Sequence, residues 1–169
     1  MTDPIGLSGK PVLVVGGAGG IGRATSQLLA ALGARVAIAD IDGAAADEVA
    51  REIGGYSIVG DVTDDGAAAA MVDHAQGKLG GLAGVANIVG RASWSDLLSV
   101  DLATWEADFR MNLLHHLMVS RAAAKHMMRQ GGGAIAIVTS VSGIYGSPRA
   151  RSLRRRQSRC GRPSPQHGR

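Results

Sequence analysis

Aromatic residues are scarce in this 169-residue chain, where two tryptophans, two tyrosines and one phenylalanine make up 3% of the sequence. Glycine and alanine are abundant instead, which favours close packing of helices on a sheet over the core of a β-sandwich. The single cysteine, Cys160, excludes an intrachain disulfide framework and most zinc sites. No apolar run approaches the roughly 18 residues that a membrane-spanning helix needs, and the first residues show no signal-peptide pattern. We therefore expect a cytoplasmic protein with no membrane segment and no bound metal.

Acidic residues are absent from the last part of the chain. Residues 149–169 contain eight arginines and no Asp or Glu, a net charge of +8, whereas residues 1–148 contain ten basic and fourteen acidic residues, a net charge of −4. The basic character therefore belongs to residues 149–169 alone, and it does not indicate specific nucleic-acid binding by the folded part. We predict that residues 149–169 form a disordered basic tail, with nonspecific polyanion binding as an alternative role.

Short apolar runs alternate with segments of helical periodicity along residues 1–148, a pattern typical of a parallel sheet covered by helices. The predicted strands are 11–15, 35–40, 56–64, 82–90 and 133–140. The predicted helices are 22–34, 42–53, 64–80 and 102–128, the last of them a long helix. We expect residues 1–148 to form one α/β domain, a Rossmann-type doubly wound parallel sheet of about five strands, incomplete at its C-terminal side.

The stretch VVGGAGGIGRA (14–24) lies between the first predicted strand and the first predicted helix. Glycines allow a tight turn and the close approach of a pyrophosphate, and the helix N-terminus offers N–H groups to the anion. Asp40 ends the second strand, twenty residues after Gly20. A carboxylate there can accept both ribose hydroxyls and repels a 2′-phosphate, which predicts NAD as the cofactor. The alternative for Asp40 is a helix cap or a solvated position, although Asp42 is also placed to cap.

These motifs resemble those of the short-chain dehydrogenase/reductase family, from residue 8 to about residue 149. The glycine loop is similar to the family's TGxxxGIG fingerprint, with Val15 in place of the threonine. The matching positions are Gly16, Gly20, Ile21 and Gly22 in this loop, Asp61 and Val62 in GDV (60–62), Asn87 and Gly90 in ANIVG (86–90), Asn112 in MNL (111–113) and Ser140 in TSVSG (139–143).

The resemblance implies an oxidoreductase that interconverts an alcohol and a carbonyl by hydride transfer with NAD(H). In the family, the serine that Ser140 matches orients the substrate oxygen, and the asparagine that Asn112 matches holds a water in a proton relay. A small-molecule substrate and a homo-oligomer through helix 102–128 are also implied. The residues that the resemblance assigns to the cofactor are Gly16, Gly20, Ile21, Gly22, Asp40, Ile41, Asp61, Val62, Asn87 and Gly90.

The family's catalytic tyrosine and lysine have no counterpart in this sequence. In the family the tyrosine is the general acid/base, and a lysine four residues later lowers its pKa. The tyrosine would fall thirteen residues after Ser140, where this chain has Leu153, and the lysine would fall at Gln157. Tyr145 lies only five residues after Ser140 and is followed four residues later by Arg149, so it does not fit this register. We therefore expect impaired catalysis, and the alternative is a non-catalytic NAD-binding domain.

A shift of one base in the reading frame would supply the missing pair. With Leu153 encoded as CTA and the arginines as CGC, the shifted codons read TAC for tyrosine and GCC for alanine. Gln157 as CAA before AGC then reads AAA, a lysine codon. The stretch RSLRRRQ (151–157) becomes AAYAAAK, with tyrosine and lysine at the two family positions. We hypothesise that a frameshift replaced the catalytic motif and the residues after it.

Two expectations concern packing. Strand 133–140 should form an exposed edge, and Leu113, Leu117 and Met118 should be partly exposed, so that the domain is only marginally stable. His115 and His116 are adjacent and point to different sides of a helix, so they cannot chelate one metal, and we expect them to be solvated or at an interface.

Overall fold

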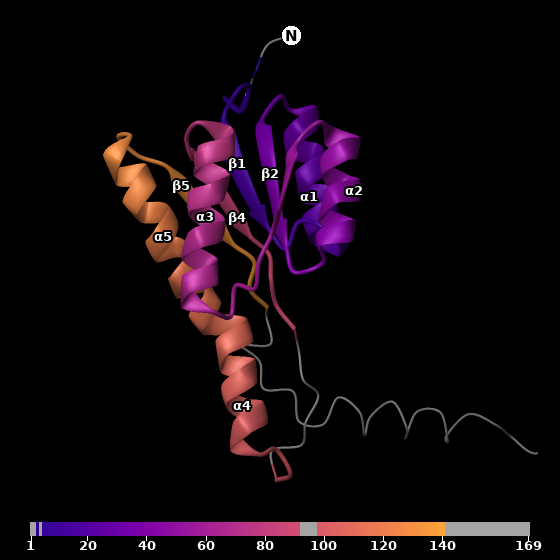
Figure 1. Cartoon of the computed structure of the whole chain (residues 1–169), viewed down its shortest axis with the longest axis vertical. Coiled ribbons are helices and arrows are strands. Elements are labelled where there is room, and N and C mark those ends of the chain that lie inside the picture. The colour runs from indigo at the N-terminus through magenta and orange to yellow at the C-terminus, as the bar shows by residue number, and fades with distance from the viewer. Residues whose placement is uncertain (1–2, 4, 92–97, 141–169) are drawn as a thin grey trace, which may run out of the picture.

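The computed structural model describes residues 3, 5–91 and 98–140, which form a parallel sheet of five strands in the order β3-β2-β1-β4-β5 (Figure 1). The elements in chain order are β1 (Pro11–Val15), α1 (Gly20–Ala31), β2 (Arg35–Asp40), α2 (Gly43–Ile53), β3 (Tyr56–Val59), α3 (Asp65–Leu79), β4 (Gly84–Asn87), α4 (Leu102–Phe109), the π-helical turn η1 (Arg110–Leu114), α5 (His115–Arg129) and β5 (Ala134–Ile137). This confirms the prediction of a Rossmann-type α/β fold. The predicted basic tail, residues 149–169, lies outside the described residues.

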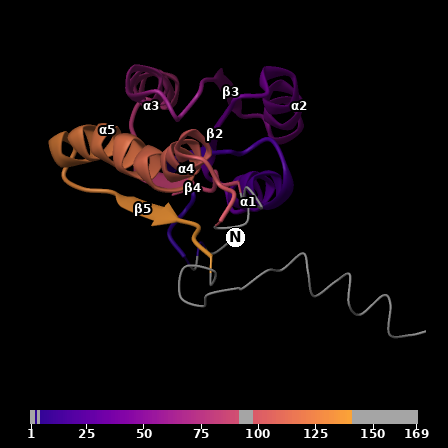
Figure 2. The ribbon, with the colours of Figure 1, turned by 90° about the horizontal axis from the view of Figure 1, so that it is seen from below.

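Both faces of the sheet are covered by helices, because side chains alternate between the faces along each buried strand. Leu13 and Val15 of β1 pack with α3 and α5, whereas Val14 and Ile38 pack with α1 and α2. All four side chains are fully buried. Figure 2 shows α3 and α5 on one side of the strands and α1 on the other. Because the strands are parallel and packed between these two apolar layers, their carboxyl ends and the loops that follow them lie along one edge of the sheet.

The predicted long helix 102–128 is interrupted, and that prediction was wrong in this respect. The π-helical turn Arg110–Leu114 separates α4 from α5. Such a turn contains an extra residue per turn and is frequent at functional sites. The part after it, α5, is held against α3 by the pair Arg121–Asp65, with both carboxylate oxygens 2.6 Å from Nη2, and by His126–Asp73 at 2.5 Å.

The exposed edge and the exposed helix positions are largely as predicted. Among the described residues, β5 pairs with β4 alone, and Ile137 is 41% exposed. Leu113 and Leu117 are 52% and 62% exposed, and Met118 is half-buried. None of the helices in the described ranges combines the length and the apolar character needed to cross a membrane.

Candidate functional site

The turn between β1 and α1 contains glycines, among them Gly16 and Gly22, whose neighbours leave no room for a side chain. Gly16 has a φ of +77°, and a Cβ there would lie 2.9 Å from Cγ2 of Val89. A Cβ on Gly22 would lie 1.8 Å from the carbonyl oxygen of Gly16. The N–H of Gly16 donates to the carbonyl of Ala39 at 2.7 Å, which fixes the loop to β2. The first turn of α1 is thus pressed against the loop, as the glycine spacing predicts.

The N-terminus of α1 faces open space. Its N-cap, Gly19, offers no side chain, and no acidic residue lies in its first turn, whereas Asp42, Asp64 and Asp101 cap α2, α3 and α4. A Cβ on Gly19 or Gly20 would meet no atom within 4 Å. Among the described residues no side chain caps α1, so its N–H groups and its positive dipole end can face an anion such as a diphosphate.

Asp40 joins the end of β2 to the glycine loop. Its Oδ2 accepts a hydrogen bond from the N–H of Ala18 at 3.0 Å, and its Oδ1 accepts one from the N–H of Asp42 at 3.1 Å. Asp42 is itself the cap of α2, which excludes that role for Asp40. Ile41 beside it is 70% exposed. The half-buried carboxylate of Asp40 therefore lies in a fixed position next to the open N-terminus of α1.

The loop after β3 is held by a hydrogen-bonded turn. The N–H and the hydroxyl of Thr63 donate to Oδ1 of Asp61 at 2.8 and 2.7 Å, and these bonds hold the pKa of Asp61 below its usual range. The side chain of Val62 is buried in the core. Arg110 of η1 also holds this loop, because its Nη1 donates to the carbonyl of Thr63 at 3.1 Å. The exposed carboxylate of Asp61 is thereby kept ionised and in place.

The loop after β4 is fastened to the π-helical turn by Asn112. Its Nδ2 donates to the carbonyls of Arg91 at 2.8 Å and Asp108 at 2.9 Å, and its Oδ1 accepts from the N–H of Arg91 at 2.9 Å. Gly90 precedes this contact and is exposed. Asn87 at the end of β4 is fully buried, and its side-chain amide has no hydrogen-bond partner among the described residues. Asn112 therefore fixes the loop that follows Asn87 and contains Gly90, the two residues predicted here to meet the cofactor.

Ser140 is exposed and lies three residues after the end of β5. The pairing of β4 and β5 continues past the strand, because the N–H of Val138 donates to the carbonyl of Asn87 at 3.0 Å. Ser140 thus follows the carboxyl end of its strand, at the same edge of the sheet as the other predicted site residues. Tyr145, Leu153 and Gln157 lie outside the described residues.

Residues 10–152 match the family model of the short chain dehydrogenases. The chain belongs to the short-chain dehydrogenase family.

Relatives of this short-chain dehydrogenase include the inactive 2-(S)-hydroxypropyl-CoM dehydrogenase 2 of Xanthobacter autotrophicus, 36% identical over 118 residues that cover 69% of this chain and 51% of the relative. The cis-4-hydroxycyclohexanecarboxylate dehydrogenase of Sinomonas cyclohexanicum is 36% identical over 149 residues, covering 85% of this chain and 59% of that protein. The chain thus spans little more than half the length of these relatives.

Solved structures agree with the family assignment. A short-chain type dehydrogenase/reductase from Mycobacterium marinum has a TM-score of 0.80 and 33% identity, covering 83% of this chain and 60% of that one. A 7α-hydroxysteroid dehydrogenase complexed with NADH and 7-oxo glycochenodeoxycholic acid has a TM-score of 0.82 and 26% identity, covering 86% and 59%. Short-chain dehydrogenases generally use NAD(P), and the glycine cradle and the open N-terminus of α1 fit its diphosphate.

His115 of this short-chain dehydrogenase is fully buried at the start of α5, so the expectation of a solvated or interface position was wrong. Its ring centroid lies 3.8 Å from that of His116. Burial and the neighbouring His116 lower the pKa of His115 to about 4, although backbone groups such as those of Arg110 and Val89 partly offset this shift. His115 is therefore neutral at pH 7 and packs as part of the core beneath the β4 loop.

Replacing His115 with Gln should remove a pH dependence of stability. The pKa of His115 is about 4 in the folded chain and 6.5 as a free side chain. Between these two values the unfolded chain binds a proton at His115 and the folded chain does not, so stability falls as the pH is lowered. Between pH 7 and pH 4 the wild type should lose about 3 kcal/mol more unfolding free energy than His115→Gln. Urea unfolding at pH 7, 6, 5 and 4 measures this. The control, His74→Gln at an exposed position of α3, should behave like wild type. Equal slopes for all three chains would contradict the assignment.

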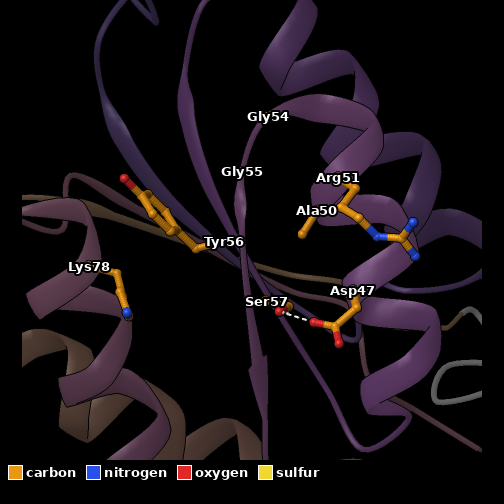
Figure 3. Close-up of a pocket in the computed structure, with 8 residues that line it drawn as sticks. All are labelled: Asp47, Ala50, Arg51, Gly54, Gly55, Tyr56, Ser57 and Lys78. Atoms are coloured by element: carbon orange, nitrogen blue, oxygen red, sulfur yellow. Dashed lines mark hydrogen bonds between the residues drawn. The ribbon is translucent and has the colours of Figure 1, made fainter.

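A groove of about 630 Å³ lies along the open edge of β3, between α2 and α3. Figure 3 shows Tyr56 and Lys78 on the α3 side and Arg51 on the α2 side, with their polar ends pointing in different directions, while Asp47 accepts a hydrogen bond from Ser57. The groove begins at the amino end of β3, whereas the glycine loop lies at the carboxyl ends of the strands. It is therefore separate from the cofactor site, and its polar groups do not converge on one point. Across the described ranges, no three His, Cys, Asp or Glu side chains are grouped to hold a metal ion.

Sequence reasoning missed two contributors to this site. Thr63 could have been found, because an Asp followed two residues later by Thr is a common signal for a side-chain-to-backbone turn. Arg110 could not, because its contact with Thr63 joins positions 47 residues apart and depends on the π-helical turn.

Proposed function

We propose that this chain binds NAD(H), with Asp40 receiving the two hydroxyls of the adenosine ribose. The observation that carries the proposal is the fixed carboxylate of Asp40, bonded to the N–H of Ala18 in the loop that would hold the diphosphate. Two backbone N–H groups position this carboxylate and leave further lone pairs for hydroxyl donors. In this assignment the loop and α1 bind the diphosphate, and Asp61 and Val62 flank the adenine.

The surroundings of Asp40 favour NAD over NADP. A bound 2′-phosphate would lie against the negative charge of Asp40 and needs a nearby arginine to compensate. Asp40 is followed by Ile41 and Asp42, neither of which is basic. The basic side chain in the first turns of α1, Arg23, is paired with Glu48 and Glu52 of α2, at 2.9 Å in each case. Arg23 would have to leave two ion pairs to reach a phosphate.

Replacing Asp40 with Asn tests this assignment. Asn keeps the size of the side chain but removes the charge that prefers hydroxyls, so NAD affinity should fall about tenfold and the preference over NADP should shrink by at least that factor. Calorimetric titration of the full chain with NAD and NADP gives both constants. Glu106→Gln, the same charge change on exposed α4, should leave them unchanged. A wild-type chain that binds NADP as tightly as NAD would refute the proposal.

We further infer that this chain transfers hydride poorly. Bound NAD(H) would supply the hydride chemistry, and Ser140 and Asn112 would orient the substrate oxygen and support a proton relay. The family's proton donor, a tyrosine activated by lysine, is replaced in this register by Leu153 and Gln157. One relative carries the name of an inactive dehydrogenase, which shows that the family includes such members.

The remaining assignments concern substrate and assembly. Short-chain dehydrogenases act on small molecules, usually as oligomers. We propose an alcohol or carbonyl substrate for the intact family architecture and a homo-oligomer through α4, η1 and α5. Support for the second comes from large apolar side chains exposed along these helices at helical spacing, namely Leu102, Trp105, Phe109, Leu113 and Leu117.

A further inference from the structure

We propose that Arg110 is a positioning residue for the adenine end of the cofactor site. The inference rests on the proposed function, because the loop that Arg110 holds is the one assigned to adenine. Arg110 Nη1 donates to the carbonyl of Thr63 at 3.1 Å. Thr63 in turn donates two hydrogen bonds to Asp61, the residue predicted to contact adenine. The guanidinium of Arg110 therefore holds the residue that positions Asp61.

The π-helical turn allows one helix to hold two loops. Arg110 and Asn112 are two positions apart, and side chains with this spacing on a helix do not face the same way. Arg110 reaches the loop after β3, and Asn112 reaches Arg91 in the loop after β4. In the sheet, β3 and β4 are separated by two strands, β2 and β1. The turn Arg110–Leu114 therefore braces the loops on both sides of the glycine loop.

Arg110 of η1 differs from the polar links between α5 and α3. Arg121 pairs with Asp65, and His126 pairs with Asp73, so both hold helix to helix. Neither pair involves a loop assigned to the cofactor, whereas Arg110 reaches the loop assigned to adenine. Loss of Arg121 should therefore loosen the helix pair, whereas loss of Arg110 should loosen the adenine loop. This difference supplies a matched control on the same helical segment.

The experiment measures binding of the two halves of the dinucleotide to the full chain. Arg110→Gln should weaken AMP and ADP-ribose about fivefold, the value of one hydrogen bond, and leave nicotinamide mononucleotide unchanged. Arg110→Lys, which keeps a donor and the charge, should recover most of the loss. Arg121→Gln removes the same charge and should leave all three ligands unchanged. A merely structural role for Arg110 would weaken both halves together.

A ligand-free readout accompanies the titrations. Hydrogen exchange of the amides of residues 61–64 should be faster in Arg110→Gln than in wild type, and that of Arg91 should not change. If wild type binds AMP and Arg110→Gln binds it equally well, the inference is overturned and the proposed function stands. If wild type binds no adenine nucleotide, the proposed function fails and the inference fails with it, whatever the exchange rates show.

Discussion

Gly22→Ala should destabilise the fold and strongly weaken dinucleotide binding, whereas Gly19→Ala, three residues earlier, should act mainly on binding. A Cβ on Gly22 would lie 1.8 Å from the carbonyl oxygen of Gly16 and 2.9 Å from Cα of Gly17. These are backbone atoms, so α1 must move away from the loop. We expect a loss of about 3 kcal/mol in unfolding free energy and at least a roughly hundredfold loss of NAD affinity.

Gly19 provides the control because its surroundings are the opposite. It has an extended backbone (φ −141°), and a Cβ there meets no protein atom within 4 Å. Alanine should therefore cost at most about 1 kcal/mol of stability as an N-cap. The added methyl would, however, enter the space that we assign to the diphosphate, so NAD affinity should fall. Urea unfolding and NAD titration of both variants separate the two effects. Unchanged stability in Gly22→Ala would show that α1 is not held against the loop, and unchanged affinity in Gly19→Ala would place the diphosphate elsewhere.

The fold could be predicted from sequence because its signals are local. β-branched runs such as PVLVV form buried strands, and the aspartate at position 42 caps the helix that follows it, with Oδ1 accepting from the N–H of Ala45 at 3.0 Å. Within 56–64, predicted as a strand running into a loop, the strand is β3 (Tyr56–Val59), and the predicted strand 82–90 is shorter in the structure, β4 (Gly84–Asn87). Residues 60–64 and 88–90 instead belong to the loops that follow β3 and β4.

The arrangement of the helix that carries Asn112 could not be predicted, because its causes are tertiary. Apolar periodicity runs through 102–128 without a glycine or proline that would mark a break. The π-helical turn is accompanied by contacts with distant segments, among them Asn112 with Arg91 and Arg110 with Thr63. Burial of His115 has the same origin, since a histidine gives no local signal of whether its face of a helix meets a sheet or solvent.

The sequence motifs predict which residues belong to the site, but they do not predict the contacts among those residues. Most of the matching motifs lie at or just after the carboxyl ends of strands, where a parallel sheet binds its ligand, whereas Asn112 lies in η1. The motifs left open how neighbouring loops hold one another. Asp40 supports the glycine loop through Ala18, and Val89 of the β4 loop packs against Gly16. The glycine loop is therefore held by residues of two neighbouring segments, so a substitution in either segment should alter the conformation of the glycine loop.

Restoring the reading frame should have the largest effect on turnover. We propose that codons near 151–158 are read one base out of frame, since the shift turns RSLRRRQ (151–157) into AAYAAAK at the family's register. The glycine loop, Asn112 and Ser140 precede this stretch and would be unchanged. Only the proton donor and the residues around and after it would differ. A positioned general acid/base contributes about 10²–10⁴-fold, so a frame-restored chain should exceed this one by at least about 100-fold in NAD-dependent alcohol oxidation.

The test begins with the gene across codons 148–160. A single-base change must open a frame that encodes a tyrosine and, four residues later, a lysine; if none does, the hypothesis is rejected. The frame-restored chain and the present chain are then compared with a panel of alcohols and carbonyls. Changing the restored tyrosine codon to phenylalanine should remove the gain while NAD binding persists, because the phenol moves the proton and Asp40 with the glycine loop holds the cofactor. Equal turnover in the present chain, lost on Ser140→Ala, would instead mean that another group at this edge of the sheet donates the proton.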